Sequence, residues 1–196
     1  MAVKRKSKSS SKAVIAAKRV SQSKKALLEA PITLGPHQIE PTYRLVHKCK
    51  DQHGLLLYYS MGTGKTIAGL TLMLNFPSKK VVIVCPEELT FVWINEIKRI
   101  NGLDLKRVQF YSYEKIGDLF NRKSLKDHIL ILDEAHHIIP LIKERMGKGT
   151  IKTSMSSMSK TRGGILEIKS LLASSYKTLV LTGTPIYTGF SDLVYL

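Results

Sequence analysis

A chain of 196 residues has room for one domain with a full hydrophobic core, but not for a second nucleotide-binding domain of similar size. Its formal net charge of +16 makes polyanions the expected partners, nucleic acid first and a membrane surface second. No apolar run approaches the length of a membrane span and no apolar signal core is evident, so we expect an intracellular protein that is not secreted. Cys49 and Cys85 lie far apart in the sequence, which favours a reducing compartment.

Residues 1–30 are rich in Lys, Ser and Ala, and the first 25 residues contain nine Lys or Arg and no acid. Such a segment buries too little apolar surface to order itself, so we expect a flexible basic tail there. The run Lys4-Arg5-Lys6 suits a nuclear address or an arm for nucleic acid, and a tail that is simply solvated is the alternative. Residues 31–196 are then expected to form the single folded domain.

After a turn-rich entry at residues 31–41, we expect a helix over residues 40–50. Short, continuous apolar runs then alternate with helical patterns, of which the clearest is the amphipathic stretch 87–100. Apolar runs separated by helices predict an α/β fold whose central, mostly parallel sheet is buried on both faces. Ligands of such folds bind at the carboxyl ends of the strands. The predicted strands are residues 55–59, 81–85, 108–111, 129–132 and 178–181.

Residues 143–163 interrupt this pattern with a long basic stretch, which either lines a nucleic-acid path or is a solvated insertion. His47, Cys49 and His53 offer three metal-ligand side chains, but zinc prefers four ligands, so we expect no zinc there. Trp93 falls on the apolar face of its predicted helix and is expected to anchor the core rather than to stack on a base.

The first predicted strand runs into a glycine loop and then a helix, which is the context of a phosphate-binding loop. Gly62 and Gly64 allow the backbone amides to turn toward an anion, and the positive end of the following helix faces the same place. Lys65 is expected to reach the β- and γ-phosphates of ATP, and Thr66 to offer its hydroxyl to Mg²⁺. An ordinary glycine turn is the alternative. The predicted nucleotide-binding residues of this loop are Met61, Gly62, Thr63, Gly64, Lys65 and Thr66.

An acidic pair, Asp133-Glu134, directly follows the fourth predicted strand. In a protein with a phosphate loop, Asp133 is expected to hold Mg²⁺ beside Thr66, while Glu134 orients and deprotonates the attacking water. Lys65 and the metal would neutralise the charge that develops on the transferred phosphoryl group. The predicted catalytic residues are therefore Lys65, Asp133 and Glu134, and the predicted metal ligands are Thr66 and Asp133. An acidic helix start favoured by the helix dipole is the alternative for the acidic pair alone.

The order of these motifs resembles the N-terminal, RecA-like half of superfamily 2 DEAD/DEAH-box helicase-like ATPases. It is most similar to Swi/Snf-type DNA translocases and to their relatives in large DNA viruses, such as the poxvirus transcription ATPases. The resemblance rests on the glutamine motif at residues 34–38, motif I at 61–66, the Ia region at 85–97, the Ib region at 112–114, motif II at 133–136 and motif III at 181–186.

The resemblance implies a three-layer RecA-like fold that uses ATP and Mg²⁺. It implies that Gln38 reads adenine, for which an amide can serve as donor and acceptor. It further implies that His136, Thr182 and Thr184 couple the ATP state to the grip on nucleic acid. Tyr59 stands where the common phosphate loop begins with glycine, and Ala135 replaces the glycine that remodellers carry in motif II.

Motifs IV to VI and their arginine finger do not occur before Leu196. Because such a finger contributes roughly 10³- to 10⁵-fold in rate, we expect this chain alone to bind ATP and to hydrolyse it slowly. The chain is then expected to be truncated before its second RecA-like domain or to receive that half from a partner protein.

The sequence therefore predicts a motor domain that hydrolyses ATP and acts on nucleic acid. DNA is favoured over RNA, and translocation is favoured over strand separation. The expected location is the nucleus, or a cytoplasmic viral factory or virion. A basic nucleotide-binding scaffold in a viral transcription or nucleoprotein complex is the alternative, and a protein held on a membrane surface by its tail is a third reading that lacks an apolar anchor.

Overall fold

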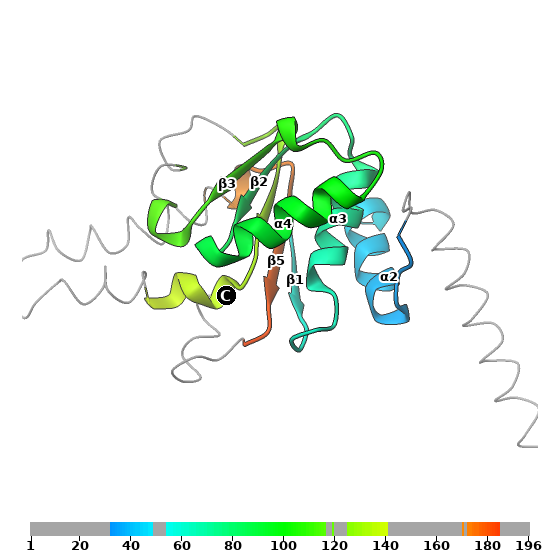
Figure 1. Cartoon of the computed structure of the whole chain (residues 1–196), viewed down its shortest axis with the longest axis horizontal. Helices are drawn as coiled ribbons and strands as arrows, with labels where there is room; N and C mark the ends of the chain where they lie inside the picture. Colours follow the sequence, from blue (N-terminus) through cyan, green and yellow to red (C-terminus); the bar gives the residue numbers. More distant parts are fainter. Residues whose placement is uncertain are drawn as a thin grey trace, which may run out of the picture.

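Parallel strands form the centre of the molecule and are arranged in the order β1-β5-β4-β2-β3 (Figure 1). The computed structural model describes residues 32–48, 54–116, 119, 125–140, 170 and 172–184. Every strand pair within this part of the chain is parallel, which confirms the predicted α/β fold. The strands are β1 Gly54–Tyr58, β2 Lys80–Val84, β3 Val108–Tyr111, β4 His128–Leu132 and β5 Lys177–Thr182, each within about a residue of its predicted ends.

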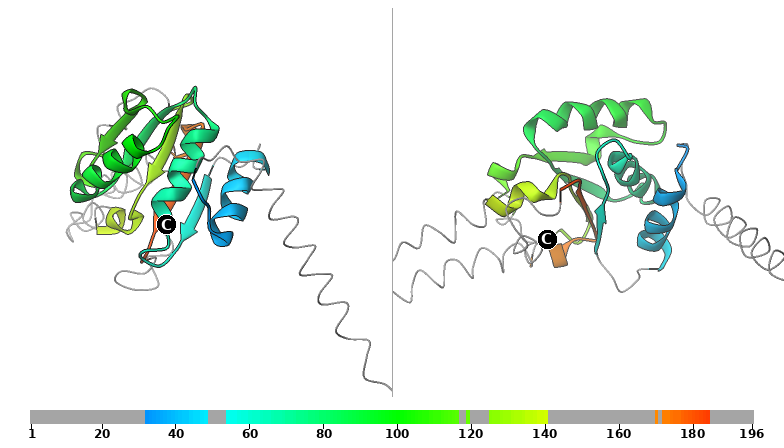
Figure 2. Two further views of the ribbon diagram at one scale, coloured as in Figure 1. Left: turned by 45° about the vertical axis from the view of Figure 1, so that its right-hand side comes forward. Right: turned by 90° about the horizontal axis from the view of Figure 1, so that it is seen from below.

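The two faces of the sheet are covered by different parts of the chain, which produces three layers (Figure 2). The helices α3 (Lys65–Asn75) and α4 (Glu87–Arg99) pack on one face, as crossovers between parallel strands must. The opposite face packs against the 3₁₀ turn η3 (Tyr113–Lys115) and the residues around Ile138. Central strands β2 and β4 are apolar on both faces because both faces are covered.

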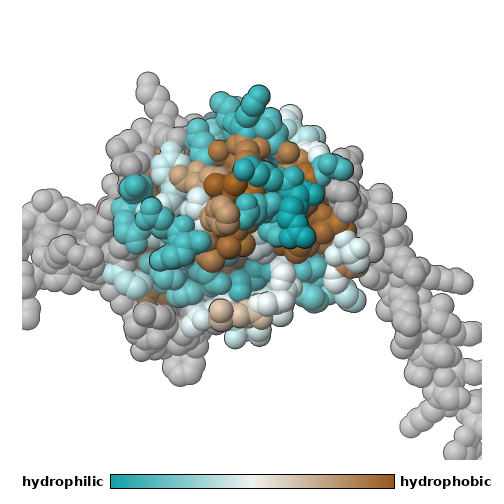
Figure 3. Space-filling model, viewed as in Figure 1, coloured by the Kyte–Doolittle hydropathy of each residue, from teal (hydrophilic) through white to brown (hydrophobic). Residues whose placement is uncertain are grey.

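Helix α4 is amphipathic, as its sequence predicts. Trp93 and Ile97 point into the core, with exposed fractions of 1% and 0%. The outer side carries Phe91 and Val92, which are 69% and 46% exposed. Figure 3 shows hydrophobic residues gathered at the centre of the face that α4 covers, surrounded by hydrophilic ones.

The helix predicted before β1 is present over residues 40–48, but it begins earlier than predicted. Helix α2 spans Pro36–Tyr43 and continues into a π-helical turn, η1 (Arg44–Lys48), so residues 36–41 are helical rather than turn-like. Pro36 is the first residue of the helix. Proline is tolerated there because an N–H at this position would make no intrahelical hydrogen bond. Pro41 lies inside the helix and leaves the carbonyl of His37 without its usual donor, but the hydroxyl of Tyr59 donates to that carbonyl instead.

The turn from α3 to β2 is held by one guanidinium group. Arg107, in the 3₁₀ turn η2 (Leu105–Arg107), donates from Nη2 to the carbonyl of Met73 at 2.6 Å. Its Nη1 donates to the carbonyls of Phe76, Pro77 and Lys79 at 2.8, 3.1 and 3.0 Å. The bond to Met73 satisfies a carbonyl in the last turn of α3, and the other three bonds tie the turn that follows the helix to the same side chain.

Several sequence predictions concern parts of the chain outside the described residues: the basic tail at 1–30, the stretch 143–163, Cys49 and His53, and residues 185–196. Within the described ranges, the structure holds no group of three metal-ligand side chains. None of the helices described is long and apolar enough to cross a membrane.

Candidate active site

The loop between β1 and α3 has the backbone shape of a phosphate cradle. Gly62 and Gly64 adopt positive φ angles of 77° and 81°, which side-chain-bearing residues rarely take. The hydroxyl of Thr63 donates to the carbonyl of Ser60 at 2.6 Å and closes the turn. Met61 lies at the tip and is 84% exposed. Lys65 and Thr66 follow in the first turn of α3, whose N-terminal amides suit an anion.

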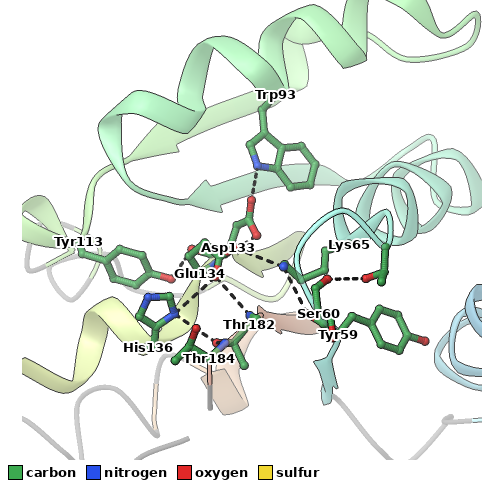
Figure 4. A network of polar contacts seen from close by, with 12 residues as sticks. Tyr59, Ser60, Lys65, Trp93, Tyr113, Asp133, Glu134, His136, Thr182 and Thr184 are labelled. Carbon is green, nitrogen blue, oxygen red and sulfur yellow. Dashed lines mark hydrogen bonds and ion pairs between the residues drawn. The ribbon is translucent and has the colours of Figure 1, made fainter. Parts of the chain in front are cut away.

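Lys65 is buried and turned toward the acidic pair (Figure 4). Its Nζ lies 3.3 Å from Oε1 of Glu134 and donates to the carbonyl of Tyr59, also at 3.3 Å. Gly183, just after β5, fits against this ammonium group, because a Cβ added there would stand 3.0 Å from Nζ. The strand order explains the meeting, since β5 lies between β1 and β4 and their carboxyl ends share one edge.

Asp133 is almost fully buried and accepts three hydrogen bonds. Its Oδ2 accepts from Nε1 of Trp93 at 2.8 Å, and its Oδ1 accepts from the backbone N of Glu134 at 3.0 Å. Its backbone carbonyl accepts from the hydroxyl of Tyr113 at 2.8 Å. Burial raises the pKa of Asp133, and the bond from Trp93 opposes part of that rise.

Trp93 has a second role that the sequence did not predict, which is to donate a hydrogen bond to Asp133. Its burial confirms the predicted core position, but its ring nitrogen also holds the carboxylate of Asp133. A buried indole usually finds an acceptor for its N–H, so a hydrogen bond of Trp93 could have been predicted from the sequence. The identity of the acceptor could not, because Asp133 lies 40 positions further along the chain.

Glu134 joins the ends of β4 and β5. It has a left-handed backbone, with φ of 50°, and its Oε2 accepts from the backbone N of Gly183 at 3.3 Å. Nδ1 of His136 lies 3.4 Å from the same oxygen and 3.2 Å from Oγ1 of Thr182. Oγ1 of Thr182 in turn accepts from the backbone N of Thr184 at 3.2 Å. Burial lowers the pKa of His136, which favours a neutral ring at pH 7.

The predicted residues therefore fall into two neighbouring groups. Lys65, Glu134, His136, Thr182 and Thr184 are linked through the contacts above, with Asp133 bonded to the backbone of Glu134. Gln38 is separate from the acidic pair and instead contacts the loop, donating from Nε2 to the carbonyls of Thr63 and Gly64 at 3.1 and 3.0 Å.

The side chains present fit a magnesium nucleotide. A carboxylate and a hydroxyl are hard oxygen donors of the kind that Mg²⁺ prefers, and Asp133 and Thr66 supply one of each. The buried ammonium of Lys65 and the loop amides suit phosphate oxygens.

Comparisons with known proteins find a family, a viral protein and two solved structures that resemble this chain. The SNF2-related domain matches residues 37–196. A protein of Acanthamoeba polyphaga mimivirus, which bears the provisional name of an ATP-dependent RNA helicase, is 29% identical over 167 residues; the match covers 84% of this chain and 32% of that protein.

Two structures of the Sulfolobus solfataricus SWI2/SNF2 ATPase core share the fold. The core in complex with double-stranded DNA has a TM-score of 0.52 and 21% identity, covering 86% of this chain and 36% of that one. The core domain by itself has a TM-score of 0.52 and 19% identity, covering 86% and 34%. The chain thus spans about a third of the length of the proteins it matches.

Proposed function

We propose, from the premise that this chain belongs to the SNF2-related domain family, that it is the ATP-binding half of a Mg²⁺-dependent motor that acts on nucleic acid. The observation that carries the proposal is the contact of Lys65 with Glu134, which brings the phosphate loop and the acidic pair together at one edge of the sheet.

In this proposal each residue has a distinct task. The loop amides and Lys65 hold the phosphates, while Thr66 and Asp133 hold Mg²⁺, which would neutralise phosphate charge when bound. When phosphates bind, Lys65 exchanges its contact with Glu134 for the phosphate oxygens. Glu134 then takes the proton of the attacking water. His136 carries the resulting change to Thr182 and Thr184, because both Glu134 and Thr182 contact its ring.

Duplex DNA is the favoured substrate. The support is the excess of basic residues together with the Sulfolobus core, whose structure contains double-stranded DNA, while the mimivirus relative bears the name of an RNA helicase. We further propose that a second RecA-like domain or a partner protein supplies an arginine finger. We also propose that the protein is located in the nucleus, or in a cytoplasmic viral factory or virion.

The central experiment measures nucleotide binding and turnover in variants of the site. Lys65→Ala should abolish binding of a fluorescent ATP analogue, because it removes the buried cation. Glu134→Gln should retain binding and abolish the slow residual hydrolysis, because a neutral amide accepts no proton. Lys98→Ala, which removes an exposed lysine of α4, is the matched control and should resemble wild type.

Equal ATP binding by wild type and Lys65→Ala would contradict the phosphate site. Equal hydrolysis by wild type and Glu134→Gln would reject Glu134 as the base. A chain that binds DNA but no nucleotide would instead support the scaffold alternative.

A further inference from the structure

The two ends of the sheet carry charges of opposite sign. Apart from histidines, the described segments at the carboxyl ends of the strands hold five acids and two lysines: Glu87, Glu88, Glu114, Asp133, Glu134, Lys65 and Lys115. The described segments at the amino ends of β2 to β5 hold six bases and two acids: Lys79, Lys80, Lys106, Arg107, Lys126, Lys177, Asp104 and Asp127. Because the strands are parallel, these six bases meet at one edge of the sheet (Figure 1), which we call the basic edge.

Some of these bases stabilise the fold, and others face solvent. The guanidinium of Arg107 holds the turn after α3. Nζ of Lys79 lies 3.0 Å from Oδ1 of Asp127 and 4.3 Å from the centre of the Tyr176 ring. Three other lysines of the basic edge are exposed and can meet a ligand from solvent: Lys80, Lys106 and Lys126.

The exposed lysines stand at the starts of three neighbouring strands. The sheet order β4-β2-β3 places Lys126, Lys80 and Lys106 side by side in that sequence. Neighbouring strands are about 4.8 Å apart, so the strand starts that carry these lysines cover about 10 Å. One strand of duplex DNA presents a phosphate about every 3.4 Å along the helix axis. Several phosphates can therefore face this row of lysines at once.

A hollow of about 570 Å³ lies at the β4 end of the row. Lys126 and Lys177 line it, together with His47, Ser174 and Ser175, and none of the described residues in its wall is acidic. Lysine and serine side chains are common donors to the phosphate oxygens of nucleic acids. The hollow is therefore suited to one phosphate group of a ligand that lies along the row.

The acidic groups of the candidate active site are too distant to repel such a ligand strongly. Strands β2 and β4 have five residues each, which makes them about 17 Å long. Charges in solvent are screened over about 8 Å at physiological ionic strength. The basic edge therefore attracts a polyanion independently of the opposite end of the sheet.

We propose that the basic edge binds the phosphate backbone of duplex DNA, and that the hollow beside Lys126 receives one of its phosphates. The proposal rests on the proposed function, in which nucleic acid is the partner, and it assigns one contact with that partner to the edge opposite the phosphate loop. An acidic polypeptide is the competing ligand. Duplex DNA fits better because its evenly spaced phosphates engage the whole row of lysines together.

The first test measures affinity of the full chain for a short fluorescent DNA duplex by anisotropy across a salt series. Lys80→Gln and Lys126→Gln are combined in one variant. Each lost phosphate contact should reduce the magnitude of the slope of log affinity against log salt by about 0.9, so the double variant should lose about 1 to 2. The matched control combines Lys98→Gln with Arg99→Gln on α4. It removes the same charge from exposed positions elsewhere and should keep the wild-type slope.

The outcomes separate this proposal from the proposed function. Equal slopes in wild type and the Lys80/Lys126 variant would overturn the basic edge as a binding surface, while DNA binding by the wild type would leave the nucleic-acid role intact. A wild-type chain that binds no DNA would refute both. The same proteins are also titrated with a fluorescent oligoglutamate. Weaker oligoglutamate binding by the variant, with an unchanged DNA slope, would overturn the proposal in favour of an acidic polypeptide.

The second test locates the bound DNA on the wild-type chain. Lysines are acetylated with a small reagent, with and without saturating duplex, and the modified positions are quantified by mass spectrometry. DNA should lower the modification of Lys80 and Lys126 several-fold and leave that of Lys98 unchanged. Equal modification of Lys80 and Lys126 in the free and DNA-bound chain would overturn the proposal.

Discussion

Loss of the hydrogen bond between the ring nitrogen of Trp93 and the carboxylate of Asp133 should change the protonation of the proposed magnesium ligand. Trp93→Phe keeps a ring in the core and removes the N–H. Because that bond favours the ionised carboxylate, its loss should raise the pKa of Asp133 further. Mg²⁺ needs the ionised form, so Mg²⁺-dependent nucleotide affinity in the variant should begin to fall at a higher pH than in wild type. A titration of affinity against pH measures this shift.

The matched control is Tyr113→Phe, which removes a hydrogen bond to the backbone of Asp133 and leaves its carboxylate alone. Both variants should lose about 1–3 kcal/mol of unfolding free energy, because each leaves a buried acceptor without its donor. Only Trp93→Phe should shift the pH profile. An identical profile in both variants would mean that the indole contributes packing alone.

The sign of the folding linkage at Asp133 follows from burial. A carboxyl group whose pKa is higher in the folded state than in the unfolded state makes the free energy of unfolding larger at low pH, where the group is protonated. That contribution is lost as the pH rises from the unfolded pKa through the folded one. At neutral pH, therefore, ionised Asp133 costs stability, and the hydrogen bond from Trp93 reduces that cost.

At the scale of elements, α3 is held at its end by Arg107 and along its side by Trp93. Arg107→Lys keeps the charge but loses the planar fork that reaches the four carbonyls, so the unfolding free energy should fall by about 1–3 kcal/mol. Urea denaturation measures the change. Arg99→Lys, which alters an exposed pair with Glu96, should change stability by less than about 0.5 kcal/mol. Equal losses of unfolding free energy in both variants would show that the carbonyl contacts of Arg107 stabilise the fold no more than an exposed ion pair does.

Gly69 in α3 is a position where packing opposes helix propensity. Alanine would favour the helix by about 1 kcal/mol. Its Cβ, however, would stand 2.6 Å from Cη2 of the buried Trp93, and overpacking of this kind costs about 1–3 kcal/mol. We expect Gly69→Ala to destabilise the chain in thermal melts and to lose less in the Trp93→Phe background. Gly54→Ala, whose Cβ meets nothing closer than 3.6 Å, is the control.

These elements also show how much of the fold and of the candidate site could be predicted from the sequence. The strands and α4 were predictable because apolar periodicity is local, and the phosphate loop and acidic pair are short motifs. The early start of helix α2 was not, because Pro36 and Pro41 indicate turns unless a distant Tyr59 supplies the missing donor. The bonds of Trp93 and Arg107 depend on how helices rotate against the sheet, which no local pattern encodes. The sheet order that brings Lys65 to Glu134 is likewise a property of the assembled fold.

At the scale of the whole molecule, the charge should govern binding to nucleic acid. Each phosphate that is neutralised contributes about −0.9 to the slope of log affinity against log salt on duplex DNA. Removing residues 1–30 deletes the nine Lys and Arg of the first 25 residues, so the magnitude of the slope should fall by up to about 8. Fluorescence anisotropy with duplex DNA across a salt series measures it. A slope that is flat, or unchanged on deletion, would contradict a role of this segment in binding the backbone.

A carbon added to Gly183 would stand only 3.0 Å from the Lys65 ammonium, so a side chain at this position would press on that group. Gly183 also donates to the carboxylate that Lys65 contacts. The residue just after β5 therefore meets both charged groups of the site, and any side chain placed there would disturb the lysine and its contact with the carboxylate.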